Sequence, residues 1–323
     1  MYRYILSTVY EEFEPKETLL DTTQDITVNV PIIVNGDQYM LEGILSLPSS
    51  NYNGVVVMLL QGSGASDLNG AMSDFPNAPM KDISKGLVKH GLATMRINKR
   101  YYQYSYLVSE KYTIYEEVIE DAISTLNILK NKYGFSDIVL VGHSLGSIVA
   151  FEIARQIPQI KAVVSMAGSP RKLQYVMYDQ YSYGYKYDNN VNEQERKAKL
   201  KRLKRIIKKI DAISSDTGES YLGIKASYWK SLNEIDQVKL AKELEIPFLF
   251  MQGGKDFQVF SDTDYLLWKK QLTMKENVSF CFFPELNHYF MQSKGKHDTS
   301  EYKIEDHVSQ DVIDKMAAWI ATI

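Results

Sequence analysis

The stretch DIVLVGHSLGSIVA, residues 137–150, decides the fold of this chain. Its first half is a short apolar run typical of a strand buried on both faces, and its second half is an apolar helix. The turn between them, GHSLG at 142–146, is so tight that the positions two residues to either side of the serine must lack a Cβ atom. Such a turn would present the Ser144 hydroxyl at the carboxyl end of a parallel sheet, above a helix N-terminus that favours negative charge. The pattern therefore predicts a nucleophilic serine, and the alternative is a glycine-rich turn with a helix-capping serine.

The same alternation of buried strand and helix continues on both sides of this turn. It predicts strands at Val55–Leu60, Leu92–Ile97, Ile138–Val141, Ala162–Met166, Pro247–Met251 and Val278–Phe283, and helices at Met80–Lys89, Tyr115–Lys132, Leu145–Gln156, Asp262–Gln271 and Asp306–Ile320. This order predicts an α/β fold with a doubly wound, mostly parallel sheet and helices on both faces. An alternating segment at Ile26–Leu47, with a tight turn at Asn35-Gly36, should add an N-terminal antiparallel hairpin at one edge.

The alternation breaks once, over a segment at about 169–245 that we call the cap segment. It holds six tyrosines between Tyr175 and Tyr187, followed by the basic run ERKAKLKRLKRIIKKI. Four apolar residues of that run recur at helical spacing (Leu200, Leu203, Ile207 and Ile210), so we predict an amphipathic helix with its apolar stripe on the core and a solvated basic face. Attraction of carboxylated substrates or of an anionic membrane is the alternative role for the basic face. We find no internal repeat or linker, and predict one domain over 1–323 with the cap segment inserted as a helical cap.

Composition excludes several classes of protein. The chain has 323 residues, and 37 Lys and Arg against 40 Asp and Glu leave a formal charge of −3, which gives no general attraction for nucleic acid. The single cysteine, Cys281, excludes an internal disulfide and a multi-thiolate zinc site. No apolar run approaches the ~18 residues of a membrane span, and the first residues, MYRYILSTVYEEFE, lack the design of a signal peptide, so we expect a cytoplasmic protein. The HExxH and P-loop patterns are both missing, and we expect no metal and no organic cofactor.

A serine hydroxyl needs a base and an orienting acid to act as a nucleophile at neutral pH. His288 follows the last predicted strand, in FPELNHYF, at the sheet edge where Ser144 should lie. Asp256 follows the preceding strand, in QGGKDFQV, and is the predicted acid, whereas Asp262 and Asp264 resemble helix-start residues, with Asp262 as a possible N-cap. The order Ser144, Asp256, His288 is that of an α/β-hydrolase. The other histidines are expected to be structural, solvated or turned away from the serine: His90, His143, His297 and His307.

The oxyanion formed by attack of a serine needs two backbone donors. We predict the N–H of Leu145, directly after the nucleophile, and the N–H of Ser63, in the glycine turn Gln61–Gly64 after an early strand. The tyrosines after Arg100 and those of the cap segment either line an aromatic cleft or cover the seam between cap and core. The residues predicted to contact substrate are Gln61, His143, Tyr101, Tyr104 and Tyr181.

Together these segments resemble the serine esterases of the α/β-hydrolase superfamily, in particular the dienelactone-hydrolase-like and acylaminoacyl-peptidase-like bacterial esterases. Members often carry His-Gly-Ser-Gly followed by Asp, and then a strand with Asp-Lys-Arg. The corresponding residues here are Gln61-Gly62-Ser63-Gly64, Asp67 and Asn98-Lys99-Arg100. The resemblance spans about Ile26 to Ile323 and is weakest across the cap segment. Gln61 in place of the usual histidine alters the side-chain support of the turn but not its backbone donors. Because Cys281 lies inside the last predicted strand, the cysteine-dependent activity of true dienelactone hydrolases is not expected.

The resemblance implies hydrolysis of carboxylic esters without a metal or an organic cofactor. With the Ser-His-Asp triad and the tyrosines above, we expect an acyl-enzyme intermediate and, as partner, a small-molecule substrate that is a small to medium hydrophobic or aryl ester. The same triad cleaves amides, so a serine peptidase acting on short or acylated peptides is the alternative. Acyl transfer to an alcohol and a non-enzymatic binding protein on the same scaffold stay open as further classes.

Overall fold

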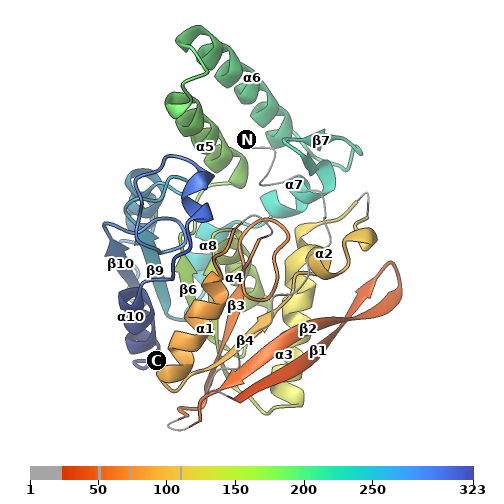
Figure 1. Ribbon diagram of the computed structural model, residues 1–323. Helices are drawn as coiled ribbons and strands as arrows, with labels where there is room; N and C mark the ends of the chain where they lie inside the picture. Colours follow the sequence, from red (N-terminus) through yellow and green to blue (C-terminus); the bar gives the residue numbers. More distant parts are fainter. Residues whose placement is uncertain (1–23, 50–51, 73–74, 110) are drawn as a thin grey trace.

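A computed structural model of the chain describes residues 24–49, 52–72, 75–109 and 111–323, so the N-terminal stretch used to predict localisation lies outside the described residues. Eight strands form one sheet in the order β1-β2-β4-β3-β5-β6-β9-β10 (Figure 1). They are β1 (Gln24–Val34), β2 (Asp37–Leu47), β3 (Val55–Leu60), β4 (Ala93–Ile97), β5 (Asp137–His143), β6 (Ile160–Met166), β9 (Phe248–Gly253) and β10 (Val278–Phe283). The strands from β4 to β10 run parallel, and β1 and β2 are antiparallel additions at one edge. The mostly parallel sheet with an N-terminal hairpin is therefore confirmed.

The edge hairpin follows from its turn residues and its alternating burial. Asn35 and Gly36 have φ angles of 53° and 91°, the left-handed values that a two-residue turn between twisted strands requires. β1 pairs with β2 along its whole length, from Gln24 opposite Leu47 to Val34 opposite Asp37. Every second residue of β1 from 28 to 34 is buried, so one face of the hairpin packs on the protein and the other faces solvent.

Helices cover both faces of the sheet, as predicted for a doubly wound fold. One hydrophobic cluster joins the sheet to α1 (Pro79–Lys89) and α10 (Gln310–Ile320). The other cluster joins it to α3 (Glu120–Asn131), α4 (Leu145–Gln156) and α8 (Gln237–Glu243). The central strands β3 and β5 are buried almost throughout, because helices lie on both of their faces and strands on both of their edges.

Three helices begin differently from the prediction. The helix expected at 115–132 starts as a π-helix, η3 (Tyr115–Ile119), and the one expected from 262 starts as η4 (Ser261–Tyr265) before α9 (Leu266–Gln271). Such wide turns do not show in a 3.6-residue pattern. α10 begins at 310 rather than 306 because the backbone N–H groups of Asp306 and Val308 donate to Asn77 and Asp82 instead of continuing a helix. Short helices that the sequence did not predict are α2 (Arg100–Gln103), η2 (Ser105–Leu107) and η5 (Thr299–Lys303).

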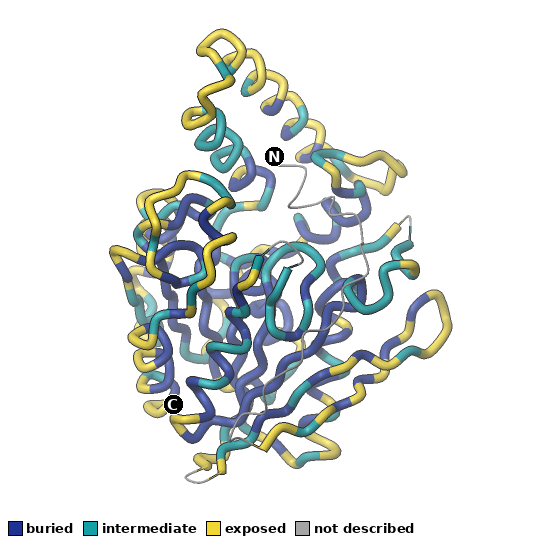
Figure 2. Tube along the Cα trace, viewed as in Figure 1, coloured by how far each residue is buried: buried dark blue, intermediate teal, exposed yellow. Residues whose placement is uncertain are grey.

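The cap segment lies between β6 and β9 in the chain. It holds α5 (Leu173–Tyr187), α6 (Glu193–Asp211), the short pair β7 (Ser220–Tyr221) and β8 (Ile224–Lys225), α7 (Ala226–Asn233) and α8. α5 and α6 form a pair that projects from the body, whereas α8 packs on α4 of the core (Figure 1). Figure 2 shows that exposed residues dominate the outer part of the α5–α6 pair. In the described ranges no helix has the length and apolarity needed to cross a membrane.

Candidate active site

The turn at 142–146 is a strained elbow between β5 and α4. Ser144 has a φ of 55° and a ψ of −116°, a backbone conformation that is costly for a residue with a side chain. A Cβ atom on Gly142 would lie 2.3 Å from the Gly146 carbonyl oxygen, and one on Gly146 would lie 2.3 Å from the Leu60 carbonyl oxygen. The close packing of α4 against β3 and β5 therefore requires both glycines. Ser144 is half-buried, and its hydroxyl has no hydrogen-bond partner within the described part of the chain.

Asp256 and His288 lie together after the carboxyl ends of β9 and β10. His288 Nδ1 is 2.8 Å from Asp256 Oδ2, and the two side chains are 3% and 0% exposed. The carboxylate also accepts from Gln252 Nε2 at 3.0 Å and from the backbone N–H groups of Gln258 and Val259 at 2.7 and 2.9 Å. The carboxylate acts as acceptor in each of these bonds, so Nδ1 of His288 carries the proton. In the neutral ring this tautomer leaves the lone pair on Nε2, as a general base requires.

A buried histidine joins the loop of His288 to the elbow. His143 Nε2 is 2.8 Å from the carbonyl oxygen of His288, and the centroids of the two rings are 4.6 Å apart. A carbonyl oxygen only accepts, so Nε2 of His143 carries the proton. Burial, and after it the proximity of His288, lowers the pKa of His143 to about 3, and the ring is neutral. Because His143 directly precedes Ser144, this contact brings the imidazole of His288 to the elbow.

The loop that carries His288 is held from its other side by Asn287. The Asn287 side chain donates to Glu301 Oε1 at 2.8 Å and accepts from the backbone N–H groups of Tyr289 and Met291 at 3.0 and 3.2 Å. Phe290, with a φ of 58°, is fully buried at the tip of the turn. The position of His288 is therefore fixed by neighbours in the chain that the sequence analysis did not single out.

The turn Gln61–Gly64 lies against the elbow, where the predicted oxyanion donors should be. A Cβ atom on Gly62 would lie 3.2 Å from Ser144 Cβ and 3.3 Å from His143 Nδ1, so only a glycine allows this approach without displacement. Leu145 is the first residue of α4, and the first N–H groups of a helix have no acceptor within it. The structure thus brings Gly62, which directly precedes Ser63, against the elbow that carries Ser144 and Leu145.

A buried lysine holds the peptide group that contains the Ser63 N–H. Lys99 Nζ donates to the Gly62 carbonyl oxygen at 2.6 Å and lies 3.3 Å from Glu117 Oε1. The Lys99 residue is only 4% exposed. The carbonyl of Gly62 and the N–H of Ser63 belong to one planar peptide unit, so fixing the carbonyl fixes the direction of the N–H. In the sequence, Lys99 stood out only as part of the motif Asn98-Lys99-Arg100, and no sequence signal pointed to Glu117.

The side chains of Gln61 and Tyr101, which were predicted to contact substrate, are engaged within the core. Gln61 Nε2 donates to the carbonyl oxygens of Asp67 and of Ile97, the latter at 3.2 Å. These hydrogen bonds stabilise the turn Gln61–Gly64. Tyr101 is buried, and its ring is 5.6 Å from that of Tyr112 in an edge-on contact.

The other two tyrosines lie in different regions. The Tyr104 hydroxyl donates to the carbonyl oxygen of Met40 at 2.7 Å, on β2. β2 is three strands away from β5 in the sheet, a lateral distance of about 14 Å at the usual strand spacing, so the structure does not bring Tyr104 to the elbow. Tyr181 lies on α5, half-buried against the core, with its ring 6.0 Å from that of Tyr185.

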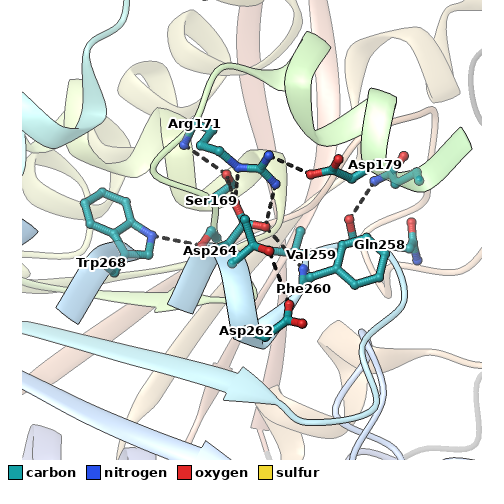
Figure 3. A network of polar contacts seen from close by, with 12 residues as sticks. Ser169, Arg171, Asp179, Gln258, Val259, Phe260, Asp262, Asp264 and Trp268 are labelled. Carbon is teal, nitrogen blue, oxygen red and sulfur yellow. Dashed lines mark hydrogen bonds and ion pairs between the residues drawn. The ribbon is translucent and has the colours of Figure 1, made fainter. Parts of the chain in front are cut away.

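α5 is fixed to the core by a partly buried ion-pair network (Figure 3). Asp264 is fully buried and accepts from Arg171 Nε and Nη2 at 2.8 and 2.9 Å and from Ser169 Oγ at 2.6 Å. Arg171 Nη1 continues the network to Asp179 on α5 at 2.6 Å. Asp264, expected to start a helix, is thus a structural link between core and cap segment. The N-cap role expected for Asp262 is wrong, because η4 begins after Phe260 and no side chain caps it.

Each of the other histidines contacts a neighbouring side chain. His307 was expected to be solvated and is exposed, but its Nδ1 is 3.2 Å from the Asp82 carboxylate. His90 ends α1 and its Nε2 is 2.7 Å from Asp314 Oδ1, a structural contact. His297 was expected to be solvated and is exposed, but its Nδ1 is also 2.7 Å from the Tyr183 hydroxyl of α5. Within the ranges that the structure describes, no group of three or more His, Cys, Asp or Glu side chains is arranged to hold a metal ion.

These features define the class of the protein. A mostly parallel sheet, a strained serine elbow after β5, and an Asp–His pair after β9 and β10 are the architecture of the α/β-hydrolase fold. The family described as PGAP1-like alpha/beta domain matches residues 101–281, and the chain belongs to that family.

The comparisons return esterases, the enzyme class that the sequence predicted. The chain is 35% identical over 289 residues to Esterase EstD of Thermotoga maritima, and the match covers 90% of this chain and 66% of that relative's length. Among solved structures, a Pyrococcus furiosus esterase superposes with a TM-score of 0.55 at 15% identity, covering 98% of this chain and 99% of the other. Est1E from Butyrivibrio proteoclasticus has a TM-score of 0.55 at 16% identity, covering 91% and 99%. At these identities the structural likeness establishes the fold, and the predicted resemblance to α/β-hydrolase esterases is confirmed.

Proposed function

We propose that the protein is a serine carboxylesterase in which Ser144 is the nucleophile, His288 the general base and Asp256 the orienting acid. The observation that carries the proposal is the buried pair of His288 and Asp256, 2.8 Å apart, held by His143 beside the strained Ser144 elbow. Besides His288, three donors hold the desolvated Asp256 carboxylate in place, and a catalytic imidazole must keep one tautomer through the cycle.

In this mechanism Ser144 Oγ attacks the acyl carbon while His288 Nε2 takes its proton. The negative charge that develops on the acyl oxygen is stabilised by the N–H groups of Ser63 and Leu145. His288 then protonates the leaving alcohol, and the same residue activates the water that frees the acid from Ser144. In this mechanism the hydrogen bond between Ser144 and His288 forms once substrate is bound, because catalytic contacts are often long or poorly aligned in free enzymes.

The substrate we propose is a small to medium hydrophobic or aryl ester, with the cap segment over the site. Aromatic rings that are buried or half-buried follow one another from the imidazole. The Tyr289 ring is 5.7 Å from that of His288, the Tyr302 ring is 4.7 Å from that of Tyr289, and the Phe257 ring is 5.4 Å from that of Tyr302. Tyr181 on α5 is the predicted substrate-binding tyrosine that is still a candidate, because it belongs to the cap segment. Est1E has been solved with ferulic acid bound, so a feruloyl ester belongs in the test panel.

The test combines a nucleophile variant with a substrate panel. Ser144→Ala should lower the hydrolysis of nitrophenyl acyl esters by about 10³-fold or more, because only oxyanion stabilisation and binding are left. Ser124→Ala, on α3, is the matched control and should keep the wild-type rate. A fluorophosphonate should label the wild-type protein and not the Ser144 variant. A Ser144→Ala protein with the wild-type rate would refute the triad. Faster turnover of aminoacyl anilides than of esters would favour the peptidase alternative.

A further inference from the structure

The outer helix of the projecting α5–α6 pair carries an unbalanced positive charge. Between Glu193 and Asp211 it has nine Lys and Arg against three acidic residues, on a chain whose net charge is −3. The rest of the chain is therefore clearly acidic, and the positive charge is concentrated on one exposed element (Figures 1 and 2).

Six of these cations form one surface, which we call the cationic face of α6: Lys201, Arg202, Lys204, Arg205, Lys208 and Lys209. All six are exposed, whereas Leu203, Ile207 and Ile210 of the same helix are buried. At 100° per residue the six cations lie on the arc opposite these three apolar residues. The apolar stripe is therefore used inside the protein, as predicted, and the cationic face points away from it.

The cationic face has no anionic partner within the described residues. The acid at the start of α6, Glu193, pairs with Arg196 and Lys197, outside the face. Asp211 at the other end accepts hydrogen bonds from Gln174 and Tyr175 of α5. Lys204 lies over the ring of Tyr178 at 5.5 Å, which is a contact with a neutral group. Six like charges within one stretch of helix repel one another, and an anionic surface would relieve that repulsion.

We propose that the cationic face of α6 docks the protein on an anionic lipid bilayer. The face runs over about 12 Å of helix and is made mostly of lysines, hydrated point charges that suit a diffuse negative surface better than a fixed phosphate geometry. Because the apolar stripe of α6 is buried in the protein, binding is electrostatic and peripheral.

The shape of the molecule favours a flat partner over a long polyanion. A plane can touch the outer side of a projecting helix while the acidic body stays away from it, and charges beyond about 8 Å are screened at physiological salt. A nucleic acid longer than the cationic face would run on toward the acidic remainder of the chain. α5 is fixed to the core because Arg171 pairs with the buried Asp264 and also contacts Asp179. Docking through α6 would therefore also orient the candidate active site relative to the lipid.

The experiment measures sedimentation of the full chain with vesicles of phosphatidylcholine alone or with about 30% phosphatidylserine, at about 0.1 M salt. The test variant replaces Lys201, Lys204, Arg205 and Lys208 by Gln. The matched control replaces four exposed lysines elsewhere, Lys89, Lys130, Lys270 and Lys303, by Gln, which changes the net charge equally. Vesicle binding is measured independently of the proposed esterase activity. A negative result for membrane docking therefore does not bear on the proposed esterase function, and the reverse also holds.

We expect the wild-type protein and the control to bind the anionic vesicles and not the neutral ones. The test variant should bind the anionic vesicles at least about tenfold more weakly, with an unchanged melting curve, because every replaced side chain is exposed. Equal binding of all three proteins, or no binding of the wild-type protein, would overturn the proposal. So would tighter binding of a labelled DNA duplex than of the anionic vesicles at the same salt, which would assign the cationic face to a nucleic acid.

Discussion

Lys99→Met tests whether the oxyanion turn is held in a reactive orientation by a buried lysine. The ammonium group of Lys99 is 2.6 Å from the Gly62 carbonyl oxygen and 3.3 Å from Glu117, and methionine fills a similar volume without a donor. The Ser63 N–H, in the same peptide unit as that carbonyl, would survive the change but lose its fixed direction and its polarisation by a charged donor.

The size of the effect follows from the value of one oxyanion donor. Complete loss of a donor costs ~3 kcal/mol of transition-state stabilisation. Misalignment of a donor that is still present should cost about half of that, which corresponds to a fall in kcat of about 10–20-fold. KM should change little, because a ground-state ester makes weaker use of the oxyanion donors. The variant also leaves the Glu117 carboxylate without its cation, so its free energy of unfolding should fall by about 3 kcal/mol.

The assay is steady-state hydrolysis of a nitrophenyl ester together with urea unfolding, with Glu117→Gln as the control. Glutamine keeps an acceptor oxygen for Lys99 and leaves the Lys99–Gly62 bond in place, so Glu117→Gln should lose stability but keep kcat within about threefold. The affinity for a boronic acid, which mimics the tetrahedral intermediate, should fall with kcat in Lys99→Met only. A Lys99→Met protein that is less stable but has wild-type kcat would refute the reasoning and reduce Lys99 to a structural role.

Three further predictions follow from the same geometry. Asp256→Asn should lower kcat by about 10⁴-fold without unfolding the protein, because the amide no longer imposes the Nδ1–H tautomer on His288; a loss below tenfold in the same ester assay would contradict the assignment of the acid. Gly146→Ala should prevent soluble expression or lower the unfolding midpoint sharply, since its Cβ would lie 2.3 Å from a backbone oxygen of β3, and an unchanged melting curve would contradict the packing. The pKa of His143 is about 3 in the folded protein and about 6.5 in the unfolded chain, so the unfolded state binds the extra proton as pH falls through this window. Wild-type stability should therefore fall by about 1 kcal/mol per pH unit relative to His143→Gln between pH 6 and 4, in urea titrations at each pH, and parallel curves would disprove a neutral buried ring.

Local patterns predicted those features that depend on residues near one another in the chain. The elbow at 142–146 and the turn at Asn35-Gly36 could both be predicted from the sequence. The elbow needs glycines for close packing, and the turn needs residues that tolerate a positive φ. The choice of Asp256 and His288 rested on one further rule, that the carboxyl ends of parallel strands meet at one edge of a sheet, and the structure places those two side chains in contact.

What the sequence did not reveal depends on contacts between distant residues. Lys99 and Gly62 are 37 positions apart, and Arg171 and Asp264 are 93 apart, so no periodicity links them. Tyr104 was expected near substrate because it follows a core strand, but that strand pairs antiparallel with β2, and the tyrosine turns to the β2 side. The tertiary fold decides which polar side chains are buried, and local patterns in the sequence do not predict it.

The segment from 256 to 264, which ends within η4, makes contacts with two parts of the structure. Its first residue orients His288, and its last holds the arginine at the base of α5, while the carbonyl of Gln258 between them accepts from Gln180 of the same helix at 3.0 Å. A designer who replaced the α5–α6 pair by that of a related protein would therefore have to move the segment from 256 to 264 with it. A graft without that segment would displace Asp256, so in the proposed esterase the cap helices and the orienting acid can be exchanged only together.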